Sequence, residues 1–350
     1  MDGPVSLQFN ATLLKGARTA AYPMDQSYKH PIEVTEIRFA FSGGPAGEEG
    51  PTKRAILHQL SFGLQFGARV GVLDDVAPLP AFCRRLGEWD GGAGNDTGEA
   101  GDPNRTKRRT ASWKLSEPVF VPAGARIYAL MQYDADIPNS NDALAAIQVW
   151  VTLVGTALPQ NTPTPKVIRI PWVSAARTPP VAIGGLVLAG RLPDDALQNT
   201  HEQAVVVQRM LGSAHTQHFN DEVFDVDVRV YDTTGAYIVR DATPMMELFN
   251  GRSRTWDMGA VLQPKEFISV EYEADPATLA LALANAADLD LEPDVLAESD
   301  EIQLIFGLVG YREVPGDELY PKEPMPVARP ARPVAIGRPV AGGPIVRPRR

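Results

Sequence analysis

The chain alternates hydrophobic and polar residues over short segments, which is the pattern of β-strands that bury one face. The clearest segments are 36–43, 58–73, 221–232 and 266–275, and the residues that they place on a common face include Ile37, Phe39, Phe41, Leu60, Phe62, Leu64, Phe66, Val226, Val228, Val230, Val270 and Tyr272. Turn-forming residues separate the segments, with 30 Gly and 31 Pro in 350 residues. Short strands at close spacing predict an all-β fold, either a sandwich or a barrel.

Three further segments are more continuously apolar, as expected of strands that are buried on both faces. They are residues 125–133, 147–155 and 302–310. The last two read IQVWVTLVG and IQLIFGLVG, and five of their nine positions are identical. Such a match between distant segments indicates an internal repeat.

Four more pairs follow in the same order and support a duplication. They are DVAP at 75–78 with DATP at 241–244, Trp113 with Trp256, VFVP ending at Pro122 with VLQP ending at Pro264, and YDAD at 133–136 with YEAD at 272–275. The number of residues between matching positions of the two copies changes at two places. At the first place the first copy has an insertion, and at the second place the second copy has one. The matching positions of Trp113 and Trp256 indicate shared core packing rather than a carbohydrate platform.

The duplication divides the chain into two domains. The first copy covers residues 1–158 and contains a long Gly-rich loop at 87–110, and the second covers 166–315 with an insertion at 276–300. A proline-rich linker at 159–165 joins them, and residues 316–350 form an extended C-terminal arm rich in Pro and Arg. Loop residues at both insertions agree with this division, although the second insertion begins with a helix-forming sequence.

The number of predicted strands favours one type of sandwich. Eight strands in each copy of about 150 residues fit a jelly roll better than an immunoglobulin-like sandwich, which needs about 100 residues. The chain also lacks the Cys…Trp…Cys pattern, because Cys83 is its one cysteine. Cys83 cannot form an internal disulfide, and we expect a small core residue there rather than a nucleophile. The sequence therefore predicts two tandem jelly-roll β-sandwich domains.

This tandem architecture resembles the double jelly-roll major capsid proteins of tailless icosahedral bacteriophages and adenoviruses, over residues 10–315. The resemblance implies a homotrimer whose six barrels approximate a hexagon and tile a shell beside lattice neighbours and other virion proteins. It also implies loops on the outside, termini at the inner face, synthesis in the host cytoplasm and a final location in the virion. The loops of this chain are short for that family.

Charge is distributed unevenly along the chain. The formal net charge is −10, yet residues 329–350 contain six arginines and no acidic residue. These are Arg329, Arg332, Arg338, Arg347, Arg349 and Arg350. Frequent proline predicts an extended arm that docks on a neighbouring subunit or contacts packaged nucleic acid or an inner membrane. A disordered solubilising tail is the alternative. A second basic run contains Arg105, Lys107, Arg108 and Arg109, and solvation is the expected role of such a run.

The sequence offers few residues for catalysis or cofactor binding. His215 and His218, with nearby carboxylates, are weak metal candidates because a third ligand is not evident. Motifs for nucleophilic hydrolysis, phosphate binding and dinucleotide binding are absent, so we expect no enzyme activity and no cofactor. Neither a leader sequence nor a membrane-spanning segment is evident. Another virion part, such as a decoration, spike-base or adaptor protein, is one alternative function, and a duplicated β-sandwich enzyme or carbohydrate-binding protein is another.

Overall fold

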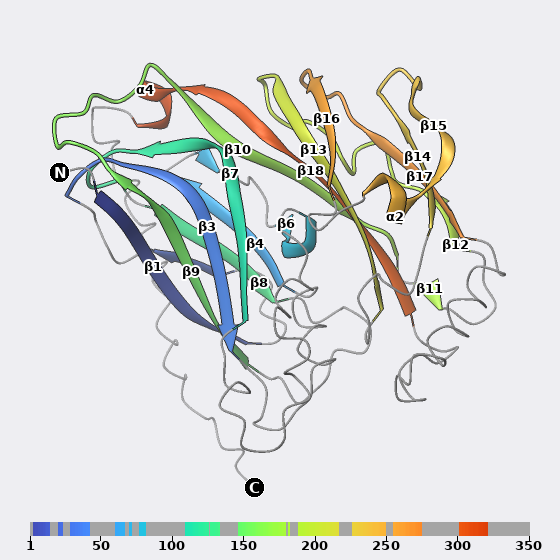
Figure 1. The fold of residues 1–350 in the computed structure, drawn as a ribbon, viewed down its shortest axis with the longest axis horizontal. Coiled ribbons are helices and arrows are strands. Elements are labelled where there is room, and N and C mark those ends of the chain that lie inside the picture. The colour runs from blue at the N-terminus through green and yellow to red at the C-terminus, as the bar shows by residue number, and fades with distance from the viewer. Residues whose placement is uncertain are drawn as a thin grey trace, which may run out of the picture. The chain divides into compact units, whose positions relative to one another are not determined.

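The structure contains two β-sandwiches, each made of two antiparallel sheets (Figure 1). The computed structural model describes residues 3–14, 20–23, 29–42, 60–66, 70–71, 77–81, 109–125, 127–133, 146–179, 181–182, 188–216, 226–249, 255–274 and 301–320. The loop at 87–108, the insertion at 276–300, Cys83 and the arm beyond Tyr320 lie outside these residues.

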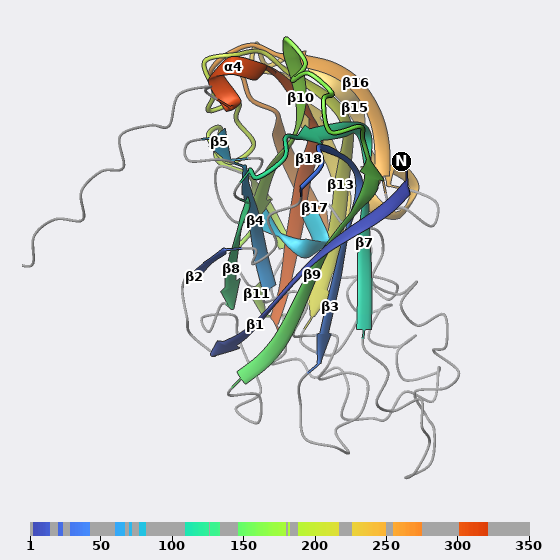
Figure 2. The ribbon, with the colours of Figure 1, turned by 90° about the vertical axis from the view of Figure 1, so that its left-hand side faces the viewer.

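The first sandwich contains a sheet of long strands and a sheet of short ones. The long strands have the order β1 (Gly3–Leu14), β9 (Ala146–Ala157), β3 (Ile32–Ser42) and β7 (Arg109–Val121). The short ones have the order β2 (Ala20–Pro23), β8 (Ile127–Tyr133), β4 (Leu60–Phe66) and β5 (Val70–Gly71), with β6 (Ala77–Pro78) also paired to β4. A 3₁₀ turn, η1 (Leu79–Ala81), follows β6. Figure 2 shows β8 and β4 on one side of this sandwich and β9, β3 and β7 on the other.

The second sandwich repeats this strand order. Its long sheet is β10 (Val167–Arg177), β18 (Glu301–Pro315), β13 (Val205–Thr216) and β16 (Thr255–Leu262), with β11 (Val181–Ala182) also paired to β18. Its short sheet is β12 (Leu188–Arg191), β17 (Ser269–Ala274), β14 (Asp227–Tyr231) and β15 (Tyr237–Pro244). A short helix, α2 (Met245–Leu248), follows β15 as η1 follows β6. This order of two four-stranded sheets is that of a jelly roll, so the chain contains two jelly rolls in tandem.

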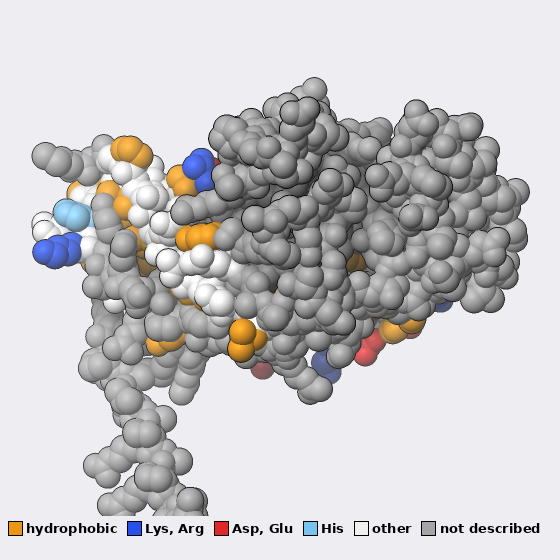
Figure 3. Space-filling model, turned by 90° about the horizontal axis from the view of Figure 1, so that it is seen from below, with side chains coloured by type: hydrophobic (Ala, Val, Ile, Leu, Met, Phe, Trp, Pro, Cys, Tyr) orange, Lys and Arg blue, Asp and Glu red, His pale blue; other side chains and the backbone are white. Residues whose placement is uncertain are grey.

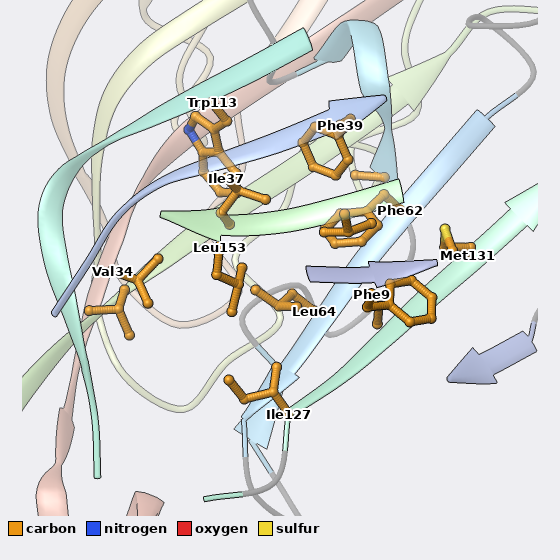
Figure 4. Close-up of a cluster of buried hydrophobic side chains, with 14 of the residues drawn as sticks. Phe9, Val34, Ile37, Phe39, Phe62, Leu64, Trp113, Ile127, Met131 and Leu153 are labelled. Atoms are coloured by element: carbon orange, nitrogen blue, oxygen red, sulfur yellow. The ribbon is translucent and has the colours of Figure 1, made fainter. Parts of the chain in front are cut away.

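Alternation along the strands creates the two cores. In β1, every second residue from Val5 to Leu13 is buried and the residues between them are exposed. In the first core, Phe39 of one sheet meets Phe62 of the other, with ring centroids 4.6 Å apart at an angle of 76°. Figure 4 shows this cluster, in which side chains from both sheets point toward one another. The second core gathers Val226, Val228 and Val230 in the same way, as the sequence predicted.

Three of the five sequence pairs occupy equivalent positions in the two jelly rolls. Pro78 pairs with Ser61 of β4 as Pro244 pairs with Asp227 of β14. Trp113 lies opposite Ile37 as Trp256 lies opposite Met210. Gly155 lies opposite Val34 as Gly310 lies opposite Val207. The duplication predicted from the sequence is therefore present in the register of the strands.

The other two pairs match the strands but not the individual residues. Strand β7 ends at Val121 and β16 at Leu262, and these residues face equivalent partners, so Pro122 corresponds to Gln263 rather than Pro264. The turn that follows has a positive φ at Gly124 and at Lys265. Counted from the positive-φ residue of this turn, Tyr133 lies nine residues further along the chain and Tyr272 seven, so the two tyrosines occupy different places in β8 and β17.

Two expectations about burial and the arm need correction. The prediction of burial on both faces is confirmed for β18, where residues 304–310 are all buried. In β8, buried residues alternate with half-buried ones. In β9, the outer face is buried only in part. The arm does not begin at residue 316, because Gly316–Leu319 form the short helix α4 and Leu319 is buried in the first core. Apolar burial of Leu319 holds this segment in place, so an extended arm can start only after Tyr320.

Candidate assembly interface

The first and second jelly rolls meet along a seam in which the second presents the outer face of its long sheet. We call the outward-facing residues of β10, β18 and β13 the second outer face, and we call β6, η1 and β7 of the first jelly roll the first edge. Leu211, Ile305 and Val309 of the second outer face belong to the hydrophobic cluster of the first jelly roll, and Val173 and Ala175 pack against it. Burial on this side explains why β18 is apolar on both faces.

The closest approach in the seam is between η1 and β18. A Cβ atom on Gly307 would lie 2.1 Å from the carbonyl oxygen of Ala81, which is far inside van der Waals contact. Ala81 itself is 1% exposed. The glycine therefore allows η1 to lie directly on the second outer face.

Polar contacts join the same two surfaces beside this apolar contact. The Ser116 hydroxyl of β7 donates a hydrogen bond to the Gln208 side-chain oxygen of β13. Arg169 of β10 lies 3.1 Å from a Glu117 carboxylate oxygen and 3.1 Å from one of Glu313. The hydrogen bond to Glu313, with the charge of Glu117, raises the pKa of Arg169. A shallow depression, open to solvent, lies beside these contacts, and Trp113, Lys114, Pro171 and Gly310 are among the residues that line it.

Helix α4 carries the chain from the second jelly roll onto the first. Leu319 is buried in the first core, and the Tyr320 hydroxyl donates a hydrogen bond of 3.2 Å to the carbonyl oxygen of Phe120. Burial raises the pKa of the Tyr320 phenol. The Gly316 N–H donates a hydrogen bond of 2.9 Å to the Lys166 carbonyl. A Cβ atom on Gly316 would lie 2.0 Å from the Pro165 carbonyl oxygen, so α4 also touches the linker. The two jelly rolls are thus held together at the seam by the continuous chain and by side-chain packing.

The equivalent sheet of the first jelly roll leaves its outer face open along β1, although Trp150 of the central strand β9 is 8% exposed on this face. We call the outward-facing residues of β1, β9 and β3 the first outer face. All outward residues of β1 from Pro4 to Leu14 are exposed, and most of them are polar. Glu36 accepts a hydrogen bond of 2.9 Å from Arg38 on this face, and this bond lowers the pKa of the Glu36 carboxyl. Thr152 and Val154 of β9 are half-buried.

The second jelly roll has an edge that corresponds to the first edge and lacks its cover. We call β15, α2 and β16 the second edge. Val261 is 53% exposed there, whereas the corresponding Phe120 of β7 is 4% exposed in the seam. Tyr237 and Ile238 of β15 are 52% and 39% exposed. Tyr237 and Ile238 are at the end of β15 that corresponds to β5, so Val261 is the exposed hydrophobic residue at the position that the seam covers in the first jelly roll.

The short sheet of the second jelly roll holds a polar cluster that the sequence did not point to. The Tyr231 hydroxyl donates a hydrogen bond to Glu271, and this contact raises the pKa of Tyr231. The Arg191 guanidinium lies 5.5 Å from the centre of the Tyr231 ring and donates a hydrogen bond to Ser269 at 2.8 Å. Tyr237 packs on Tyr231 with ring centroids 4.6 Å apart. The cluster orders the outer side of this sheet through its own contacts.

The residues nominated from the sequence lie mostly outside the described segments. His215 is in β13, where it pairs with Gln303, while His218 is not among the described residues. No group of three metal-binding side chains occurs in the described part of the chain. Arg109 is the first residue of β7, and the other basic-loop residues and the six arm arginines fall outside. The metal and arm hypotheses thus stay predictions.

Two surface properties of the described residues complete the picture. Figure 3 shows one face on which the described charged side chains are few and of both signs. Among the helices described here, none has the length and hydrophobicity that would be required to cross a membrane. No pattern in the sequence pointed to the seam residues Gly307, Ser116 and Gln208, because their role depends on contacts between segments that are far apart in the chain.

Comparison with known proteins gives a structural likeness and no sequence relative. No protein-family model matches the chain, and no curated protein matches its sequence. The structure resembles PBCV-1 VP54 fitted into a reconstruction of the virophage Sputnik, with 10% identity, a TM-score of 0.44, and coverage of 90% of this chain and 95% of that one. It also resembles a chain of Sulfolobus Turreted Icosahedral Virus, with 9% identity, a TM-score of 0.40, and coverage of 89% and 90%.

The major capsid protein P2 of Bacteriophage PM2 is a third similar structure. It shares 8% identity with this chain at a TM-score of 0.36, and the match covers 89% of this chain and 98% of P2. The likeness to double jelly-roll major capsid proteins is therefore one of fold, and it extends over most of both chains.

Proposed function

We propose that this chain is a structural virion protein, the major capsid protein of a bacteriophage, and that its purpose is to associate with copies of itself. The observation that carries the proposal is the unequal burial of two equivalent surfaces. The second outer face is covered by the first edge of the same chain, whereas the first outer face is exposed along β1 and the second edge is exposed at Val261. Further copies of the chain can cover the first outer face and the second edge by repeating the contact that already exists within one chain.

Repetition of this contact is head-to-tail, because the two surfaces that meet are different. Head-to-tail contacts form a closed ring when the rotation between neighbours closes and an open filament when it does not. A ring of six jelly rolls takes three chains, which gives a trimer with nearly hexagonal symmetry that can tile a shell. Obligate interfaces of this kind bury about 2,000 Å² or more.

The first outer face is more polar than the second outer face, which fits a contact made after folding. Ser6, Gln8 and Arg38 of the first outer face replace Val173, Ala175 and Leu211 of the second. A polar outer face keeps the free chain soluble and lets the contact form reversibly, since interfaces of folded partners are less apolar than cores.

The C-terminal arm has a separate part in this proposal. Its six arginines would contact packaged nucleic acid, an anionic inner membrane or a neighbouring subunit. Removal of residues 321–350 should abolish binding to DNA in a filter assay without changing the thermal stability of the jelly rolls. Binding by the full chain should weaken steeply with salt if counterion release drives it.

Measurement of the native particle tests the function directly. Light scattering and electron microscopy of the purified full chain should show trimers with a hexagonal outline, and shells or flat arrays at high concentration. A protein that stays monomeric at all concentrations and salt conditions, or that forms an isologous dimer, would contradict the proposal.

A further inference from the structure

One row of residues crosses each outer face at the same height, and the two rows differ at every position. In the second jelly roll the row is Ala175, Gly307 and Leu211, on β10, β18 and β13. In the first it is Gln8, Thr152 and Arg38, on β1, β9 and β3. Small and apolar residues in one row correspond to larger polar ones in the other.

The row of the second jelly roll is the part of the second outer face that contacts the first edge. Gly307 leaves space for the Ala81 carbonyl, Leu211 is 5% exposed within the first hydrophobic cluster, and Ala175 packs against that cluster. A side chain at position 307 would meet backbone rather than a movable side chain, so η1 would have to shift away. The first edge therefore needs a glycine at this point of the face that it covers.

The row of the first jelly roll cannot make the same contact with a first edge. Thr152 has a Cβ where Gly307 has none, and Arg38 is paired with Glu36 at 2.9 Å on the surface. Docking of a first edge here would place a carbonyl against Thr152 and would bury the guanidinium, which is costly unless its partners are kept. The equivalent position of the second edge is different, because Glu247 of α2 takes the place of Ala81 and is exposed.

We infer that the row Gln8–Thr152–Arg38 prevents first jelly rolls from joining to one another, so that the first edge is reserved for the second outer face. The need arises whenever a first jelly roll folds before the second, which is the usual order for an N-terminal domain during synthesis. At that stage the first jelly roll exposes both an edge and an outer face, and head-to-tail pairing between copies would grow into filaments. The inference goes beyond the proposed function, since it concerns the folding chain rather than the finished particle.

Refolding of the full chain tests this inference. The transplanted-row variant carries Gln8→Ala, Arg38→Leu and Thr152→Gly, and its control carries Ser6→Ala, Thr12→Ala and Gln148→Ala, all at exposed positions of the same face. Both are diluted from denaturant over a range of protein concentrations and sized by light scattering. The transplanted row should lose wild-type-sized product as concentration rises, with larger species replacing it, and the control should behave like the wild type.

A second variant examines the other row. Gly307→Thr should open the seam, which we expect to speed hydrogen exchange of the buried η1 segment by about tenfold or more relative to the wild type. The inference is overturned if the transplanted row refolds like the wild type at every concentration, or if Gly307→Thr leaves exchange in η1 unchanged. Neither readout uses shell formation, so a wild type that never forms trimers rejects the proposed function and leaves the refolding comparison to decide this inference.

Discussion

Gly155 and Gly310 lie in equivalent places, each pressed against the backbone of the neighbouring strand at a β-bulge. A Cβ atom on Gly155 would lie 2.0 Å from the Glu33 carbonyl oxygen, and one on Gly310 would lie 1.9 Å from that of Val206. The ladder skips one residue beside each glycine, between Val34 and Glu36 in β3 and between Val207 and Arg209 in β13. The bulge bends the strand toward its neighbour, so the repeated segment needs glycine at its last position.

Substitution of one of these glycines should destabilise the jelly roll that contains it. Gly310→Ala forces the β13 backbone away from β18, and overpacking of this kind costs about 1–3 kcal/mol. Urea unfolding of the purified variant measures the change. Gly3→Ala is the control, because nothing lies within 4 Å of the added Cβ atom, and its effect should stay within about 0.5 kcal/mol. Equal stability of the two variants would contradict the role given to the bulge.

The Glu36–Arg38 pair should make stability depend on pH in a defined direction. Arg38 lowers the pKa of Glu36 in the folded chain, so the pair stabilises the fold above the ordinary carboxyl pKa and loses this effect as pH falls through the lowered value. Arg38→Met should therefore be less stable than the wild type at pH 7, with the difference shrinking below about pH 4. Chemical denaturation at several pH values gives the comparison. In a Glu36→Gln background the same substitution should show no such trend, and a trend that persists there would refute the assignment.

Val261 should matter for association rather than for folding. Val261→Asp places a charge on the second edge, where a partner would bury it, and self-association should weaken by at least about tenfold, or 1.4 kcal/mol. Sedimentation at several concentrations measures this. The unfolding free energy should change by less than about 0.5 kcal/mol, because the side chain is 53% exposed. Ala189→Asp, exposed on the opposite edge strand β12, should leave association unchanged. Loss of association in both variants would point to net charge instead of the edge.

Helix α4 should contribute to stability although it follows the second jelly roll. Leu319→Ala removes a buried side chain from the first core and should cost about 2–5 kcal/mol. Tyr320→Phe removes the hydrogen bond to Phe120 and should cost about 0.5–1.5 kcal/mol. A chain that ends at Tyr320 should unfold at the wild-type temperature, whereas one that ends at Pro315 should unfold earlier. Scanning calorimetry distinguishes the two truncations, and identical transitions would show that α4 does not hold the seam.

The sequence by itself determined the strands, the duplication and the division into two jelly rolls. These features are local or repeated, since burial of one face imposes a period of two and each copy keeps equivalent residues such as Trp113 and Trp256 at equivalent sites. The register was less well determined where turns changed, as at Pro122 and Pro264, because a single shifted residue in a turn leaves the alternation of the next strand looking the same.

Only the tertiary structure decided which outer face is covered and which is left open. The strands β9 and β18 have closely similar sequences, yet Thr152 is half-buried and Gly307 lies beneath η1. Contacts such as Ser116 with Gln208 and Tyr320 with Phe120 join residues 92 and 200 positions apart. A pattern along the chain records whether a residue is apolar but not which distant surface will meet it, because that depends on how two finished sandwiches pack.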